Sequence, residues 1–142
     1  MALEDSSSKA YFEHQITVTK DQIDELEHVN NAIYLTYAEN CARAHCESFG
    51  LTIEGFKNYG VLPIVRKHSI TYFKPALLGD ELSISTEVTR MGGVKAERIN
   101  KVKRGSDLLA EVLTEWVWLE TGKLRPTRVP EELMTLFDFK PE

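Results

Sequence analysis

The residues from Asp24 to Tyr34 bring a carboxylate, an imidazole and two amides together just before a stretch with helical spacing. A carboxylate such as Asp24 can attack an electrophilic carbonyl directly, or it can deprotonate a water that attacks instead. Backbone N–H groups at a helix N-terminus can hold the negative charge that develops on the carbonyl oxygen. These residue types could serve carbonyl chemistry with Asp24 as the catalytic carboxylate, and the alternative is that the aspartate before the helix is a cap or a loop acceptor.

Five nearby residues are candidates for substrate binding. His28 either polarises and positions a substrate or bonds to the loop backbone, and Asn30 or Asn31 is a good N-cap for the following helix. The backbone N–H groups near Asn31 and Ala32 are the candidate donors to the carbonyl oxygen. Tyr34 is interpreted as a pocket wall or packing residue rather than as an acid.

Other residues that could do chemistry are weaker candidates. Glu39, one or two turns into the helix, is a reserve catalytic carboxylate, and its alternative role is that of a solvated or interface-paired acid. Cys41 and Cys46 lack an activating histidine and acid and point in different directions around the helix, so we expect neither a nucleophile nor a disulfide. The four histidines are scattered without ligand spacing, and no metal site is predicted.

Two kinds of periodicity predict the elements that position these residues. Residues 11–19 alternate with the period of a strand, a polar loop follows over 20–31, and a helix is expected over 31–49 and closed by Gly50. A short helical or irregular stretch and four strands come next, joined by turn-like links that favour antiparallel neighbours. These segments are 52–59, then strands 61–74, 81–90, 94–103 and 108–120, with weak helical character over 131–137.

The element order predicts an α+β fold in which a curved antiparallel sheet wraps around one long central helix. Alternation marks one face of two of the strands, with Leu82, Ile84, Thr86 and Val88 on the first and Ala110, Val112, Thr114, Trp116 and Trp118 on the second. The length of 142 residues fits a single domain. We expect this domain to cover residues 11–142, after a disordered tail at residues 1–10.

The composition limits the partners of the chain. A net charge of -5 argues against a general affinity for nucleic acid or for an anionic membrane. No apolar run approaches the roughly 20 residues that cross a bilayer. The two cysteines are expected to be reduced, and the start of the chain lacks the pattern of a secretory signal. These features predict a cytoplasmic protein.

Two sequence segments resemble a known family. The spacing Asp24-x-x-Glu27-His28-Val29-Asn30-Asn31, with Tyr34 three residues on, is similar to the signature of the 4-hydroxybenzoyl-CoA thioesterase family, and Lys74-Pro75-Ala76 with Gly79-Asp80 is similar to a second family segment. The resemblance covers roughly residues 12–119 and implies the hot dog fold. It also implies hydrolysis of an acyl-CoA or aroyl-CoA thioester without a cofactor, with the loop aspartate as nucleophile or general base.

The family usually has glycine where Glu27 stands. If that glycine serves a positive φ, a glutamate strains or reshapes the loop. The departure leaves room for an alternative function, which is a non-catalytic acyl-CoA-binding or regulatory domain. An acyl chain on a carrier protein, in place of CoA, is a further possibility.

The resemblance also implies partners. The family closes its sheet edge and its acyl cleft by dimerisation, often with two dimers joining as a tetramer, so we expect a homo-oligomer. The active site would then combine Asp24 and the helix end of one chain with strand residues 65–68 of another. Six basic residues are expected to offer a landing area for CoA phosphates, or else to keep an exposed hairpin soluble. They are Arg90, Lys95, Arg98, Lys101, Lys103 and Arg104.

Overall fold

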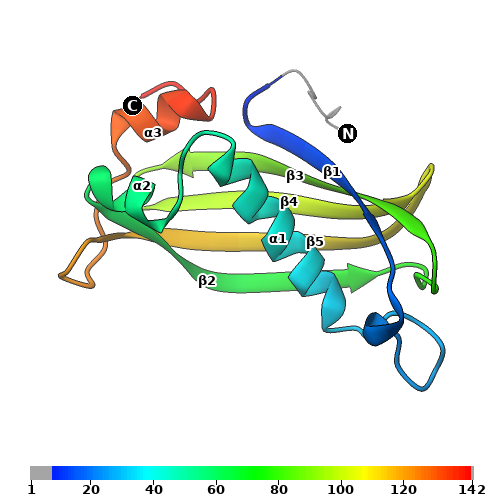
Figure 1. Ribbon diagram of the computed structural model, residues 1–142. Coiled ribbons are helices and arrows are strands. Elements are labelled where there is room, and N and C mark those ends of the chain that lie inside the picture. Colours follow the sequence, from blue (N-terminus) through cyan, green and yellow to red (C-terminus); the bar gives the residue numbers. More distant parts are fainter. Residues whose placement is uncertain (1–7, 142) are drawn as a thin grey trace.

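The computed structural model describes residues 8–141 and contains one five-stranded antiparallel sheet (Figure 1). The strands lie in the order β1-β3-β4-β5-β2, so β1 and β2 form the two edges. The elements along the chain are β1 (Tyr11–Thr17), the 3-10 helix η1 (Lys20–Gln22), α1 (Ile33–Glu47), α2 (Ile53–Asn58), β2 (Val61–Tyr72), β3 (Glu81–Gly92), β4 (Lys95–Arg104), β5 (Asp107–Glu120) and α3 (Glu131–Leu136). The predicted helices and strands are confirmed, with boundaries that differ by at most two residues.

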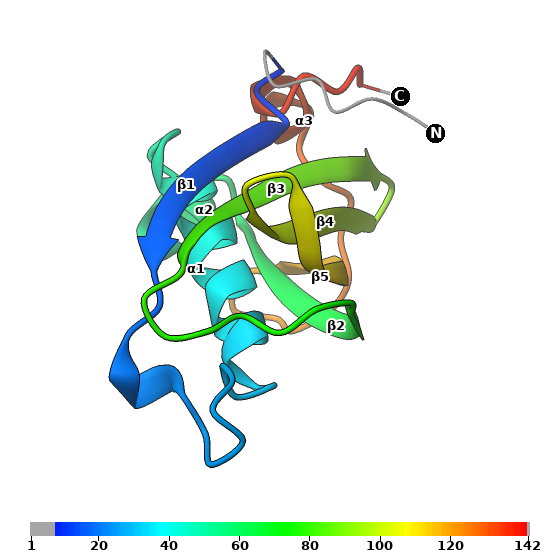
Figure 2. The same ribbon diagram turned by 90° about the vertical axis from the view of Figure 1, so that its right-hand side faces the viewer.

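The long helix α1 lies across the concave face of the sheet (Figures 1 and 2). The predicted inward rows of β3 and β5 are buried against it, as is one face of the helix itself. Burial of apolar surface from both layers stabilises this arrangement by roughly 25 cal/mol for each Å² removed from water. The predicted α+β fold, a curved antiparallel sheet around one long helix, is therefore confirmed.

Local signals set both ends of α1. Before the helix, the Asn30 side-chain oxygen accepts the Ala32 N–H at 2.9 Å, and the Asn30 carbonyl accepts the Ile33 N–H at 2.9 Å. After the helix, Gly50 adopts a φ of 75°, which a residue without a Cβ does at little cost. The predicted stop at Gly50 is confirmed, whereas the N-cap position is Ala32 and the Asn30 side chain bonds to the turn just before it.

Strand β2 carries a β-bulge that shapes the concave face. The register shifts between Val65 and Lys67, so Val65 lies opposite Trp116 and His68 lies opposite Thr114, both on the inward row of β5. A bulge adds one residue to a strand and thereby resets its alternation. As a result, two β2 residues that are three positions apart both face α1.

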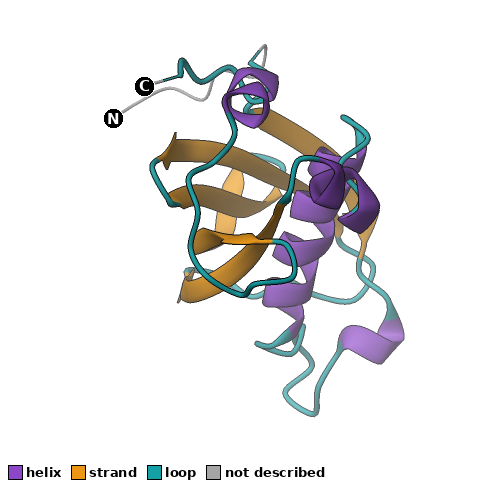
Figure 3. Ribbon diagram, turned by 90° about the vertical axis from the view of Figure 1, so that its left-hand side faces the viewer, coloured by secondary structure: helices purple, strands orange, loops and turns teal. Residues whose placement is uncertain are grey.

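The C-terminal helix α3 packs at one end of the molecule, beside the end of α1 (Figure 3). Phe137 makes edge contacts with the rings of His45 and Phe49, at centroid distances of 5.3 Å. The His45 Nε2 lies 2.7 Å from the Lys9 carbonyl, and burial lowers the pKa of His45 to about 4. His45 is therefore a neutral core residue at pH 7.

The tail predicted for residues 1–10 lies mainly outside the described residues. Of its last residues, Ala10 is buried and its carbonyl accepts the Val88 N–H at 2.8 Å. The Lys9 N–H donates to an Asp138 carboxylate oxygen at 2.7 Å. These contacts attach the segment before β1 to strand β3 and to the C-terminal segment.

Three further observations concern residues 8–141. Cys41 and Cys46 are both free thiols, as predicted. This part of the chain holds no group of three histidine, cysteine or acidic side chains placed to bind a metal ion. None of its helices has both the length and the apolar character that crossing a membrane requires.

Candidate active site

The loop that carries Asp24 is a tight reversal closed by its own backbone. Ile23 and Val29 form an isolated antiparallel bridge, and the Asp24 N–H donates to the His28 carbonyl at 2.9 Å. The Asp24 side-chain oxygen Oδ1 accepts the Leu26 N–H at 2.9 Å. Its second oxygen, Oδ2, makes no hydrogen bond to a described residue. The loop thus orients the carboxylate through one oxygen and leaves the other available.

Glu27 has a φ of 64°, so the position where the family has glycine does require the left-handed conformation. The Glu27 N–H donates to the Asp24 carbonyl at 3.0 Å, which holds the reversal closed. A residue with a Cβ loses about 1–2 kcal/mol in this conformation. Glu27 therefore strains the loop.

Replacing Glu27 by glycine is expected to raise the free energy of unfolding by roughly 0.5–1 kcal/mol, after allowance for the larger chain entropy of glycine. Chemical denaturation of the variant measures this difference. Glu25→Gly is the matched control, because Glu25 lies in the same loop without a positive φ. That variant should lose stability. If both variants lose stability equally, Glu27 is not a source of strain.

The backbone N–H groups just before α1 differ in their hydrogen bonds. The Ala32 N–H is occupied by the Asn30 side chain and the Ile33 N–H by the Asn30 carbonyl. The Asn31 N–H has no acceptor among residues 8–141. Of the two amides proposed from the sequence, only that of Asn31 is therefore free to bind a substrate oxygen.

Tyr34 lies in the first turn of α1 and faces the core. Its side chain is buried, its hydroxyl oxygen accepts the Ala76 N–H at 2.9 Å, and its ring lies edge-on to Tyr72 at 5.3 Å. Burial raises the pKa of Tyr34, and the nearby Asp24 carboxylate raises it further. The Tyr72 hydroxyl donates to the Asn31 carbonyl at 2.8 Å and so ties β2 to the helix start. These contacts are compatible with the predicted role of Tyr34 as a pocket wall or packing residue.

The remaining predicted residues lie on the surface of the same region. His28 and Asn31 are exposed, and the His28 carbonyl is the acceptor that closes the loop. Asn30 is exposed as well, and its side chain accepts the Ala32 N–H. The six residues selected from the sequence therefore form one continuous segment around the start of α1, in which Asp24 and the Asn31 N–H have unused hydrogen-bonding capacity.

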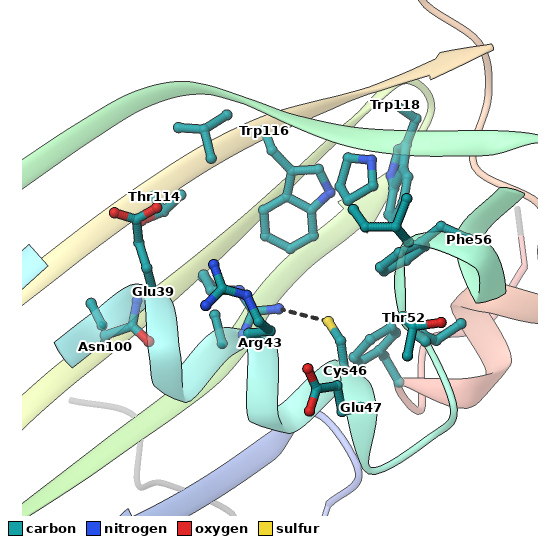
Figure 4. Close-up of a pocket in the computed structure, with 18 of the residues that line it drawn as sticks. Glu39, Arg43, Cys46, Glu47, Thr52, Phe56, Asn100, Thr114, Trp116 and Trp118 are labelled. Atoms are coloured by element: carbon teal, nitrogen blue, oxygen red, sulfur yellow. Dashed lines mark hydrogen bonds between the residues drawn. The ribbon is translucent and has the colours of Figure 1, made fainter. Parts of the chain in front are cut away.

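A cavity of about 420 Å³ lies farther along α1, between the helix and strands β2, β4 and β5 (Figure 4). Its wall is mainly apolar and includes Phe56, Val65, Trp116, Trp118 and Phe137. This volume is in the range of small-molecule sites, and none of the six selected residues lines it. On the helix the cavity begins at Ala38, which is about 8 Å from the first residue of α1.

Sequence reasoning missed several residues of this cavity. The inward row of β4 consists of Ala96, Arg98, Asn100 and Val102, and all four are buried. Arg98 therefore does not belong to the predicted surface for CoA phosphates, because its position in the pleat points it toward α1. The sequence signal that could have shown this is the two-residue period of a strand: if Ala96 and Val102 face inward, so do Arg98 and Asn100 between them. The reserve carboxylate Glu39 does line the cavity.

Comparisons with known proteins identify the family. Residues 7–137 match the sequence profile of the Thioesterase-like superfamily, and the chain belongs to this superfamily. The acyl-acyl carrier protein thioesterase ATL3 of Arabidopsis thaliana is 25% identical over 133 residues, which cover 89% of this chain and 67% of the relative. The acyl-CoA thioester hydrolase YbgC of Escherichia coli O157:H7 is 27% identical over 112 residues, which cover 77% of this chain and 82% of the relative.

Solved structures share the fold. The 1,4-dihydroxy-2-naphthoyl-CoA thioesterase Slr0204 of Synechocystis superposes with a TM-score of 0.81 at 18% identity, over 90% of this chain and 96% of that one. A protein assigned as an oleoyl thioesterase from Lactobacillus plantarum superposes with a TM-score of 0.86 at 16% identity, over 93% of this chain. This chain spans about half of that protein, 52% of its length.

The predicted family, the hot dog fold and the predicted class of enzyme, a thioester hydrolase, are confirmed. The individual roles of Asp24, His28, Asn30, Asn31, Ala32 and Tyr34 stay predictions.

Proposed function

We propose that the chain hydrolyses the thioester bond of an acyl-CoA to a free acid and CoA, with Asp24 as the catalytic carboxylate and the Asn31 N–H as the donor to the carbonyl oxygen. The observation that carries this proposal is the free Asn31 amide at the start of α1, in the same segment as the unused Asp24 oxygen. A preorganised N–H stabilises the oxyanion that forms when the carbonyl is attacked. The curated relatives with acyl-CoA and acyl-carrier-protein thioesters as substrates support the choice of a thioester.

Two routes are open to the Asp24 carboxylate. In the first, it attacks the carbonyl carbon, CoA leaves as the thiolate, and water then hydrolyses the resulting anhydride. In the second, it removes a proton from a water that attacks the carbonyl carbon, and the collapse of the tetrahedral intermediate expels the thiolate. In both routes the Asn31 N–H stabilises the same oxygen, and the thiolate takes up a proton.

The cavity between α1 and the sheet is the proposed acyl site. Its largely apolar wall favours the burial of a hydrocarbon or aromatic group. Val65 and His68 of β2 both line it, and these are the strand residues expected to meet Asp24 of a second copy. In the proposed oligomer, the cavity of one chain holds the acyl group, and the helix start of another chain reaches the thioester.

The exposed edge strand β2 supports a homo-oligomer, either a dimer or a tetramer. Ile64, Val65, Tyr72 and Phe73 are all exposed along or just after this strand. An edge strand offers unpaired backbone groups, and pairing between two copies satisfies them while covering the apolar side chains. The proposed arrangement joins two sheets through β2.

Ile64→Lys is expected to reduce the solution mass from at least twice 16.2 kDa to that of a single chain. Ile64 is 43% exposed on β2 and does not line the cavity, so a charge there opposes edge pairing without altering the acyl site. Light scattering coupled to gel filtration measures the mass. Leu78→Lys, at a 59% exposed residue in the loop between β2 and β3, is the matched control. A wild-type chain of 16.2 kDa in solution would refute the oligomer.

A panel of acyl-CoA and aroyl-CoA esters, assayed by release of free thiol, tests the proposed function. The same acyl groups attached to an acyl carrier protein form the second arm. We expect cleavage of CoA esters with a kcat/KM above about 10⁴ M⁻¹s⁻¹ for the preferred acyl group. Cleavage of carrier-protein esters alone would change the substrate class, and binding without any cleavage would favour the non-catalytic alternative.

The proposed reaction suits a cytoplasmic location. Two free thiols, Cys41 and Cys46, are compatible with a reducing compartment.

A further inference from the structure

A buried arginine forms part of the cavity wall. Arg98 is only 6% exposed and stands on the inward row of β4. One guanidinium nitrogen donates to the Thr86 hydroxyl at 2.7 Å, and another lies 3.9 Å from the Cys46 sulfur, the contact drawn as a dashed line in Figure 4. The guanidinium carbon lies 5.1 Å from the centre of the Trp116 ring. Arg98 is therefore held in place by neutral groups.

No carboxylate among residues 8–141 forms an ion pair with Arg98. Glu39 and Glu47 also line the cavity, yet neither is a partner of the guanidinium. Burial raises the pKa of the Cys46 thiol, so this neighbour is uncharged at pH 7. A buried charge without a counter-ion destabilises a folded protein, and such charges are normally paired. The unpaired Arg98 charge thus lowers the stability of the fold, and an anion bound beside the guanidinium would offset this loss.

Other polar atoms of the same wall also lack protein partners. The Asn100 side-chain oxygen is buried and accepts no hydrogen bond from a described residue, and the indole N–H groups of Trp116 and Trp118 are buried without an acceptor. All three side chains line the cavity beside Arg98. Buried polar atoms are usually satisfied, and each exception in a native structure needs an explanation, such as a functional role or a bound water or ion.

The surroundings of Arg98 indicate which part of a substrate would reach it. Arg98 stands on the inward row of β4, its guanidinium lies over the Trp116 ring, and Phe56 and Trp118 line the same cavity. A nucleotide with several phosphates is too polar for these apolar walls, whereas an acyl group with one charged end matches them. An Arg guanidinium binds a planar carboxylate through paired, charge-assisted hydrogen bonds.

We propose that the cavity receives an acyl group whose far end carries a carboxylate, and that Arg98 binds this carboxylate. The preferred substrate is then the monothioester of a dicarboxylic acid. This inference rests on the proposed function for the thioester end, while the recognition of the acid end depends on the cavity alone.

Binding of small ligands tests the cavity without any turnover. Both tryptophans of the chain, Trp116 and Trp118, line the cavity, so intrinsic fluorescence reports its occupation. Hexanoate and hexanamide have the same chain and differ in charge at one end. We expect hexanoate to bind at least about tenfold more tightly than hexanamide to the wild-type protein. Equal affinity, or no detectable binding of either ligand, contradicts the proposal.

Arg98→Met removes the charge at similar volume and is expected to abolish the preference for hexanoate. Its thermal midpoint should not fall, because a well-packed apolar side chain replaces an unpaired buried charge. Arg98→Lys keeps the charge and loses the paired geometry, so an intermediate preference is expected, which provides a second test if Arg98→Met does not fold. Arg125→Met is the control, because Arg125 is exposed, pairs with Glu120 and does not line the cavity. A preference retained in Arg98→Met overturns the assignment.

Turnover separates this inference from the proposed function. We expect kcat/KM for adipoyl-CoA to exceed that for hexanoyl-CoA by at least about tenfold, and this ratio to collapse in Arg98→Met. If thioesters are cleaved with a ratio near one, the role of Arg98 is wrong and the proposed function stands. If hexanoate binds preferentially and no thioester is cleaved, the proposed function is wrong and the anion site stands.

Discussion

Asp24→Asn is expected to lower kcat for thioester hydrolysis by about 10²- to 10⁴-fold. The amide keeps the size of the carboxylate and can still accept the Leu26 N–H, so the loop should retain its path. It lacks the negative charge that either attacks the carbonyl carbon or takes a proton from water. Thiol release under saturating substrate measures kcat, and circular dichroism verifies that the variant is folded.

Two companion variants make the Asp24 result specific. Glu25→Gln removes a charge from the exposed residue next to Asp24 and should change kcat by less than about threefold. Glu39→Gln examines the only other carboxylate with a sequence-based claim to catalysis, which lines the cavity. A large loss in Glu39→Gln together with near-normal turnover in Asp24→Asn would move the catalytic role from the loop to the helix.

Asn31→Pro is expected to lower kcat by about 10²- to 10³-fold, because proline removes the Asn31 N–H, which is the proposed donor to the carbonyl oxygen. Asn31 lies before the first residue of α1, so a proline there removes no hydrogen bond within the helix. The substitution therefore deletes a single donor and leaves the helix intact. The same thiol assay measures the loss, and thermal unfolding checks the helix.

Asn31→Ala separates the backbone from the side chain at this position. It removes the Asn31 amide group and keeps the backbone N–H. If the backbone donor carries the effect, Asn31→Ala should be about 10²- to 10³-fold more active than Asn31→Pro. Equal activities of the two variants would assign the effect to the side chain and leave the oxyanion without its proposed donor.

The fold could be predicted from the sequence because its two layers alternate cleanly. In β3 and β5 every second residue is apolar or small, and these rows are the ones that pack against α1. The helix between Asn30 and Gly50 contains no glycine or proline and has an asparagine turn at one end and a left-handed glycine at the other. Along these elements the conformational preference of each residue agrees with its burial, so the residue types and their spacing are sufficient to predict the element boundaries.

The cavity could not be predicted because its polar residues break those rules. In β4, Arg98 and Asn100 occupy inward positions that alternation assigns to apolar side chains, so the strand resembled a charged surface hairpin. In β2, the bulge at Arg66 resets the alternation and brings Val65 and His68 to one face. The Asn30 side chain occupies the Ala32 N–H and leaves the Asn31 N–H without an acceptor. This contact depends on the conformation of the turn, which the residue types alone do not fix.

Glu27 and Arg98 both oppose the local preference for stability, and both lie where a substrate is proposed to bind, whereas Leu124 and Asp138 hold a positive φ away from those regions. Glu27 holds a positive φ in the loop of Asp24, and Arg98 is a buried charge in the cavity wall. Natural sequences depart from local consistency mainly at functional sites. The proposed substrate path runs from the thioester at the helix start of one chain to the acid end inside the cavity of another, and Glu27 and Arg98 lie at its two ends.

A crystal structure with an acyl-CoA analogue in which a methylene group replaces the thioester sulfur tests the central claim most directly. The account predicts that the carbonyl oxygen of the analogue lies about 2.7–3.1 Å from the Asn31 nitrogen. The Asp24 carboxylate should lie about 3–3.5 Å from the carbonyl carbon, or one water away from it. A carbonyl group bound beside Glu39, with the Asn31 N–H facing solvent, would contradict the account.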